Sequence, residues 1–182
     1  MKIEKAQIIR EALALLDERG LDQLSMRTLA ERLDVKASAI YWHVAHKAEL
    51  INLMTQDFFQ RANRAAPRGV GWREWLLGFG RALHRILVSH RDAARLCAIA
   101  DPGLERLQVE LDRLVSPLQA AGFDWATAVS YETAVISLTL GCAIFEESKL
   151  LRDFFKEDIS FKKSFDRGLR AMVGGFAEPG GA

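Results

Sequence analysis

Apolar residues recur along this chain at intervals of three and four positions, the spacing that gathers them on one face of an α-helix. Glycine and proline are sparse until the last few residues, and no long run alternates apolar with polar positions as a strand would. We therefore expect an all-α protein. The predicted helices cover residues 2–19, 25–33, 36–44, 47–62, 72–90 and 93–100, one that ends at 121, one from 124 through 144, and one over 160–176.

Breaks in this pattern divide the chain into two parts. Residues 65–71, Ala-Ala-Pro-Arg-Gly-Val-Gly, interrupt the helical period and are expected to form a linker loop. The predicted boundaries are an N-terminal domain at 1–46, a connecting helix at 47–64, a C-terminal helical domain at 72–176 and a disordered tail at 177–182. Pro117 is expected to bend or interrupt the helix that ends at residue 121.

Two of the predicted helices, residues 25–33 and 36–44, are too short to be stable alone and are joined by a tight turn at Asp34 and Val35. That arrangement is typical of a helix-turn-helix, whose second helix enters the major groove of DNA. The candidate DNA contacts are Arg27, Thr28, Lys36, Ala37, Ser38, Ala39, Tyr41, Trp42, His43 and Lys47. Lys47 is the best placed for a phosphate, because it opens a helix whose free N–H groups favour an anion. The pattern leaves open the alternative that these helices only pack, with Tyr41 and Trp42 in the core.

Composition and charge exclude several classes of protein. A net charge of +1 excludes a uniformly basic protein, although it is compatible with a locally basic face. Cys97 and Cys142 lie far apart without a CxxC spacing, so we expect neither a disulfide framework nor a zinc site, and no cofactor. The chain does not begin like a secretory signal, and its longest apolar stretch, 134–145, is shorter than the roughly 20 residues of a membrane span. The expected location is the cytoplasm, with no membrane contact.

Several runs occur together and in order, namely Ala12-Leu13-x-Leu15-Leu16, Gly20-Leu21, Ser25-Met26-Arg27-x-Leu29-Ala30-x-x-Leu33 and Ile40-Tyr41-Trp42-His43-Val44-x-x-Lys47-x-x-Leu50. This combination resembles the N-terminal domain of the TetR family of transcriptional regulators. Past the linker, Gly71-Trp72-x-x-Trp75-Leu76, Arg91-Asp92-x-Ala94, Ala121-Gly122-Phe123 and Leu138-Thr139-Leu140-Gly141 are similar to the regulatory domain of the tetracycline repressors. The resemblance implies a homodimer that binds a palindromic double-stranded DNA operator and releases it when a small-molecule effector occupies a cavity in each subunit.

The positions that hold a magnesium-tetracycline chelate in those repressors differ in this chain. The resemblance places Cys97 and Ala100 where a histidine and a threonine would stand, and Asp101 in place of an arginine. A thiol is a poor magnesium ligand, because that ion prefers hard oxygen ligands, and no metal-binding residues are predicted. We expect a mainly hydrophobic or aromatic effector in a cavity lined by Asn63, Phe79, Leu83, Cys97, Pro102, Leu114, Val129 and Ser137. The alternative is that these residues fill a packed core.

The last two long helices carry more apolar residues than one internal face needs, so we expect them to form a four-helix bundle across a dimer. The alternative is that they close a monomer core. A second functional hypothesis is an effector-independent DNA-binding regulator on the same scaffold. An all-α enzyme is disfavoured, because the chain has no Glu-x-x-His pattern and no glycine-rich phosphate loop, and His84 and His90 lie off a common helix face.

Overall fold

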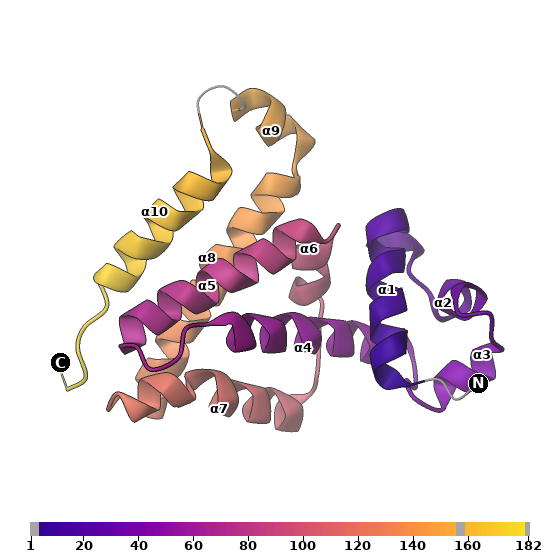
Figure 1. The fold of residues 1–182 in the computed structure, drawn as a ribbon, viewed down its shortest axis with the longest axis horizontal. Helices are drawn as coiled ribbons and strands as arrows, with labels where there is room; N and C mark the ends of the chain where they lie inside the picture. Colours follow the sequence, from indigo (N-terminus) through magenta and orange to yellow (C-terminus); the bar gives the residue numbers. More distant parts are fainter. Residues whose placement is uncertain (1–3, 156–158, 181–182) are drawn as a thin grey trace.

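The computed structural model describes residues 4–155 and 159–180, and within these ranges the chain is helical without a β-strand (Figure 1). The N-terminal part contains α1 (Lys5–Arg19), the short 3-10 helix η1 (Leu21–Gln23), α2 (Met26–Arg32) and α3 (Ala37–Tyr41), and α4 (Lys47–Ala65) follows. The C-terminal part contains α5 (Trp72–Ser89), α6 (Ala93–Ala98), α7 (Leu104–Ala120), α8 (Trp125–Glu147), α9 (Lys149–Phe155) and α10 (Phe161–Gly174). The expected all-α fold is confirmed.

The first three α-helices form a small domain around the beginning of α4 (Figure 1). Each contributes to its core, where Leu16, Leu29, Ile40 and Leu50 are fully buried. α1 is followed by Gly20, whose φ of 80° is one that residues with a side chain rarely adopt. A Cβ at Gly20 would lie only 2.9 Å from the carboxylate of Asp92, so the absence of a side chain there lets the C-terminal part come close.

α5 is the central helix of the C-terminal part, because it packs against α4, α8 and α10 (Figure 1). α7 covers α8, and α6 contacts α4, α5 and α8. The buried residues Phe58 and Ala62 of α4 belong to the same apolar cluster as Leu76 and Leu83 of α5. α4 therefore belongs to the cores of both parts and connects them mechanically.

Pro117 does not interrupt its helix, because α7 continues through it to Ala120. A proline lacks the N–H that would bond the carbonyl four residues earlier, here that of Arg113. The hydroxyl of Ser116 donates to this carbonyl at 2.9 Å and supplies the missing partner. The structure also contains η1 and α9, which the periodicity did not predict because each is too short to show a helical repeat.

The predicted disordered tail begins at Ala177 and Glu178, which contact the C-terminal part, while 181 and 182 lie outside the described residues. Glu178 pairs with Arg73 of α5 and accepts a hydrogen bond from the indole N–H of Trp72 at 3.3 Å. The N–H of Ala177 donates to the hydroxyl of Tyr131 at 3.0 Å. These partners are distant in sequence, so the local pattern of the tail carried no sign of them.

α8 is the one helix in the described ranges that is long and apolar enough to cross a membrane by length and composition. It packs against α5, α6, α7 and α10, and its buried face includes the ionisable residue Glu132. α8 therefore packs within the C-terminal part through one face, and five of its 23 residues are buried in the single chain.

Candidate DNA-binding face and effector site

The two short helices of the N-terminal part are held in a defined geometry by local hydrogen bonds. Ser25 Oγ accepts the Thr28 N–H at 3.1 Å, and Thr28 Oγ1 accepts the Ser25 N–H at 3.0 Å, which caps the start of α2. Asp34 turns the chain with a left-handed φ of 52°, and the Val35 N–H donates to the Ala30 carbonyl at 3.1 Å. The hydroxyl of Thr28 already serves this cap, so a role of Thr28 in DNA contact stays a prediction.

α3 and the residues after it leave large side chains in solvent. Trp42 is 89% exposed and Tyr41 is 50% exposed, and His43 beside them is also exposed. Bulky aromatic side chains are normally well buried, so two adjacent exposed ones indicate a surface for interaction. The alternative that Tyr41 and Trp42 belong to the core is wrong, because Ile40 and Val44 occupy it.

The other residues predicted to contact DNA on α2 and α3 fall into two groups. The exposed ones are Arg27, Lys36 and Ser38, and the half-buried ones are Ala37 and Ala39. The Arg27 guanidinium pairs with Glu31 at 3.0 Å across one helical turn, and both side chains lie in solvent. Such an exposed pair contributes little to stability, so Arg27 is free to exchange its carboxylate for a phosphate.

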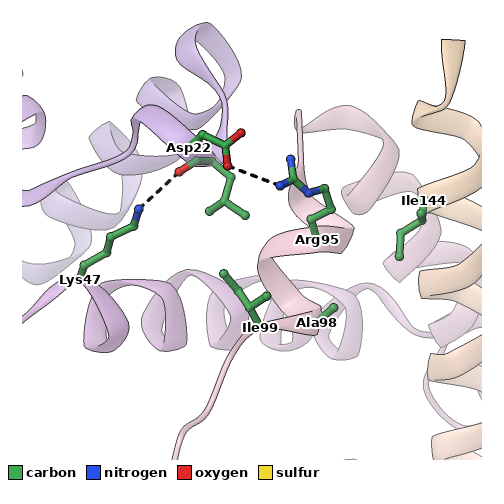
Figure 2. Close-up of a pocket in the computed structure, with 7 residues that line it drawn as sticks. Asp22, Lys47, Arg95, Ala98, Ile99 and Ile144 are labelled. Atoms are coloured by element: carbon green, nitrogen blue, oxygen red, sulfur yellow. Dashed lines mark hydrogen bonds and ion pairs between the residues drawn. The ribbon is translucent and has the colours of Figure 1, made fainter.

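Lys47 stands at the beginning of α4. The helix starts after His46, whose Nδ1 accepts the Glu49 N–H at 3.1 Å. The Lys47 ammonium lies 3.5 Å from the carbonyl of Leu21. Figure 2 shows Lys47 pointing toward the segment that contains Asp22. The first turn of α4 presents free N–H groups and the positive end of the helix dipole, so this end of the helix suits an anion.

A surface pocket of about 410 Å³ lies where the two parts of the molecule meet (Figure 2). Its lining consists of Leu21, Asp22, Lys47, Arg95, Ala98, Ile99 and Ile144. Asp92 accepts the Leu21 N–H at 2.9 Å through one oxygen and the Arg95 guanidinium at 2.9 Å through the other. Burial raises the pKa of Asp92, but these two bonds together lower it below the ordinary value, so the carboxylate is ionised at neutral pH. Both backbone polar groups of Leu21 are therefore held, the N–H by Asp92 and the carbonyl by Lys47.

Two further contacts connect the N-terminal half of the chain to the segments around α6. Asp17 of α1 accepts the Arg91 N–H at 3.0 Å and lies 2.9 Å from the His90 ring nitrogen. Asn52 of α4 exchanges two hydrogen bonds with the backbone of Asp101, at 2.8 and 2.9 Å. A displacement of α6 or of the loop after it would be transmitted to α1 and α4 through these bonds.

The residues predicted to line an effector cavity differ in burial. Phe79 and Leu83 of α5 and Leu114 of α7 are buried, whereas Asn63, Cys97, Pro102 and Val129 are half-buried. Ser137 does not fit an interior cavity, because it lies on the exposed side of α8, about two residues out of phase with the buried Val135. Neither the junction pocket nor a second pocket of about 370 Å³ along α1 and α4 includes any of the eight residues.

Two polar residues of the interior were not among those predicted. Glu132 of α8 is fully buried, the Trp75 side chain of α5 is 4% exposed, and neither the Glu132 oxygens nor the Trp75 indole N–H has a hydrogen-bond partner in the described part of the chain. Burial raises the pKa of Glu132 well above its ordinary value. The sequence did carry a signal for Glu132, namely its position on the buried face of α8. The buried residues of this helix are Ala128, Glu132, Val135, Thr139 and Ala143.

The residues present do not fit a magnesium site. Within residues 4–155 and 159–180, no three His, Cys, Asp or Glu side chains are grouped so that they could hold a metal ion. Burial raises the pKa of the Cys97 thiol to about 12, so this side chain is neutral at physiological pH. A neutral thiol offers no charge to a hard divalent cation.

The capped helix-turn-helix with its exposed aromatic residues, joined through α4 to a larger helical domain, defines a DNA-binding regulatory protein. Comparison with known families agrees. Residues 8–54 match the model of bacterial regulatory proteins of the tetR family, and residues 65–158 match the model of the tetracyclin repressor-like C-terminal domain. The chain belongs to the TetR family of transcriptional regulators.

Individual relatives match over almost the whole chain. The class A tetracycline repressor of transposon 1721 from Escherichia coli is 31% identical over 97% of this chain and 92% of its own length. A crystal structure of a TetR variant from Acinetobacter baumannii in complex with minocycline has a TM-score of 0.77 at 30% identity, covering 96% of this chain and 97% of that one. Mycobacterium smegmatis BioQ has a TM-score of 0.76 at 30% identity, covering 95% and 97%. The relatives with a stated activity are regulators of transcription.

Proposed function

We propose that this protein is a transcriptional repressor that binds a palindromic DNA operator as a homodimer and releases it when a small-molecule effector binds. The observation that carries the proposal is the exposed pair Tyr41 and Trp42, presented by a capped helix-turn-helix next to Lys47. Short side chains at Ala37 and Ser38 permit close approach to base edges, while Lys36 and Lys47 supply positive charge for phosphates. The proposed site of action is the cytoplasm, where the operator lies.

The proposed dimer uses α8 and α10. α8 is strongly apolar, yet only five of its 23 residues are buried in the single chain. Trp125, Ile144 and Phe145 stand among its exposed side chains. A helix with this much uncovered apolar surface is stabilised by a partner, and a two-fold axis would pair α8 and α10 with the same helices of a second copy. A two-fold dimer reads two half-sites about one DNA turn apart.

The proposed effector is small and mainly hydrophobic or aromatic, because Phe79, Leu83 and Leu114 dominate the buried part of the proposed site. A class A tetracycline repressor has been solved in complex with 5a,6-anhydrotetracycline and magnesium. Among the residues that the structure describes, no group of side chains could hold such an ion, so we propose that the effector binds without one. Adding magnesium or a chelator should leave effector-driven release of DNA unchanged.

α4 is the proposed connection between the two sites. Lys47 lies at its DNA end, Asn52 is bonded to the loop after α6, and Asn63 lies near its far end. Allostery requires two states that the effector binds with different affinity. In the proposed mechanism the effector shifts α6 and its following loop, α4 tilts, and the distance between the two α3 helices of the dimer no longer matches the operator.

The test is selection of binding sites from random double-stranded DNA with the purified full chain, followed by sequencing. The expected result is an enriched palindrome whose half-sites lie about one helical turn apart. The Trp42→Ala variant serves as the negative control, because its side chain is 89% exposed and its removal should leave the fold intact. Enrichment of no sequence, or of one without two-fold symmetry, would contradict the proposal.

A further inference from the structure

Glu132 is an unusual residue to find in the interior of α8. It is fully buried, and both carboxyl oxygens lack a hydrogen-bond partner within the described residues. Buried polar groups are nearly always paired, and an isolated buried carboxylate is costly. The other two buried polar side chains follow the rule, since His84 lies 2.7 Å from Glu146 and the Thr139 hydroxyl donates to the Val135 carbonyl at 2.7 Å. The lack of a partner at Glu132 therefore calls for a specific explanation.

A second unpaired group lies on α5, which packs against α8. The Trp75 indole N–H has no acceptor although the side chain is buried, and its ring stacks on Phe79 with centroids 5.5 Å apart. Two contacts between α5 and α8 bracket this region. The ring centroids of Trp72 and Tyr131 are 6.2 Å apart, and a Cβ on Gly80 would lie 3.0 Å from the Val135 side chain. Trp75 and Glu132 both fall within the segments that these contacts bring together.

The first half of α7 buries few of its side chains. α7 packs against both α5 and α8, but none of its residues before Leu114 is buried. Leu104, Leu107 and Val109 are instead exposed apolar side chains. A segment with few buried contacts opens at low cost in free energy, so it can move aside to admit a ligand.

We propose that Glu132 is the polar anchor of the effector site and that the effector is an aromatic compound bearing a protonated amine. The inference rests on the proposed function and adds the chemical class of the ligand. On binding, Glu132 would release its proton to solvent, and the ammonium of the ligand would donate to the resulting carboxylate, which has no hydrogen-bond partner within the described residues. The stacked rings of Trp75 and Phe79 favour both an aromatic body and a nearby cation, and the Trp75 N–H remains free for an acceptor on the ligand.

The test compares two fluorescent compounds that differ in one group. Aminomethylanthracene is a cation at neutral pH, and hydroxymethylanthracene is its neutral counterpart of nearly the same shape. The full-length wild-type protein should bind the amine at least about tenfold more tightly than the alcohol, as expected for a charged hydrogen bond in an interior site. In Glu132→Gln this preference should fall to within about twofold. Glu74→Gln is the matched control, because it removes a negative charge from the exposed side of α5 next to Trp75, and it should keep the wild-type preference.

A second variant covers the case in which Glu132→Gln folds poorly. Glu132→Leu replaces the carboxyl with an apolar group and should bind the alcohol but lose the preference for the amine. The proposal is overturned if the wild type binds both compounds equally or binds neither, or if Glu132→Gln retains the preference. Operator binding is measured separately on the wild type. A protein that binds a palindromic operator but prefers neutral compounds refutes the ligand class alone, whereas failure to bind any operator refutes the proposed function.

Discussion

The clearest energetic consequence of the unpaired Glu132 is a dependence of stability on pH in the absence of effector. The ordinary pKa of 4.5 applies to this residue in the unfolded chain, and burial raises the pKa in the folded protein. Below pH 4.5 the carboxyl is protonated in both states and contributes no slope. Between 4.5 and the folded pKa, the unfolded chain loses the proton while the folded protein keeps it. The free energy of unfolding therefore falls as pH rises through this interval.

The size of the effect follows from linkage. One proton retained in the folded state and lost from the unfolded state lowers the free energy of unfolding by about 1.4 kcal/mol per pH unit. For a chain of this size that corresponds to roughly 3–5 °C in Tm per pH unit. Other carboxylates also titrate, so the quantity to measure is the difference between the wild type and Glu132→Gln, in which this proton is absent. Protein concentration is held fixed, because dimerisation makes Tm depend on it.

The assay is thermal unfolding of both proteins between about pH 5 and pH 7.5, followed by circular dichroism. We expect the Tm of Glu132→Gln minus that of the wild type to increase with pH up to the folded pKa of Glu132. Glu132→Leu, which removes the unpaired polar group altogether, should be more stable than the wild type at neutral pH by about 1–3 kcal/mol. A Tm difference that stays constant over this range would mean that Glu132 ionises normally in the folded protein. The argument that it is buried without a partner would then be refuted.

Three other predictions concern the DNA-binding face and its connection to the C-terminal part. Trp42→Ala should weaken operator binding by at least about tenfold in fluorescence anisotropy while changing stability by less than about 0.5 kcal/mol, because its side chain is 89% exposed. Ser25→Ala removes the cap of α2 and should lower the free energy of unfolding in urea by about 1 kcal/mol, and an unchanged midpoint would show that the cap is not needed. Asn52→Ala should leave operator binding intact but raise the effector concentration needed for release, measured in the same anisotropy assay. A normal effector response in this variant would exclude the bonds to Asp101 from the coupling.

The helical period was enough to predict the all-α fold, since most helices are long and have one apolar face. It failed where structure depends on one or two side chains. α7 continues through Pro117 because the Ser116 hydroxyl bonds the carbonyl that the proline leaves free. α9 is only seven residues long, which is shorter than the stretch of sequence in which a helical repeat can be recognised. Neither feature can be found by counting apolar residues.

The DNA-binding face and the interior effector site could be predicted from the sequence to different degrees. The helix-turn-helix is a local unit, so the spacing from Ser25 to Lys47 was sufficient to locate it, although only the structure shows that Tyr41 and Trp42 are exposed. An interior site is assembled from helices that are far apart in sequence. Similarity to relatives indicated positions along the chain, but not which face of a helix each side chain occupies. Ser137 was predicted from the resemblance to the tetracycline repressors and is exposed, whereas Glu132 lies in phase with Val135 and Thr139 on the buried side of α8. The helical phase within α8 was the better guide.

The junction at Leu21 shows how the two ends can influence each other. Lys47 bonds the Leu21 carbonyl, while Asp92, at the start of α6, bonds the Leu21 N–H. A phosphate would compete with Leu21 for the Lys47 ammonium, and a shift of α6 would move Leu21 itself. The effector can change operator affinity only by the difference between its affinities for the two arrangements of α6, typically about 1–3 kcal/mol. A charged bond to Glu132 that forms fully in one arrangement and poorly in the other is large enough to supply that difference. A neutral compound in the same site would therefore occupy it without releasing the DNA as effectively.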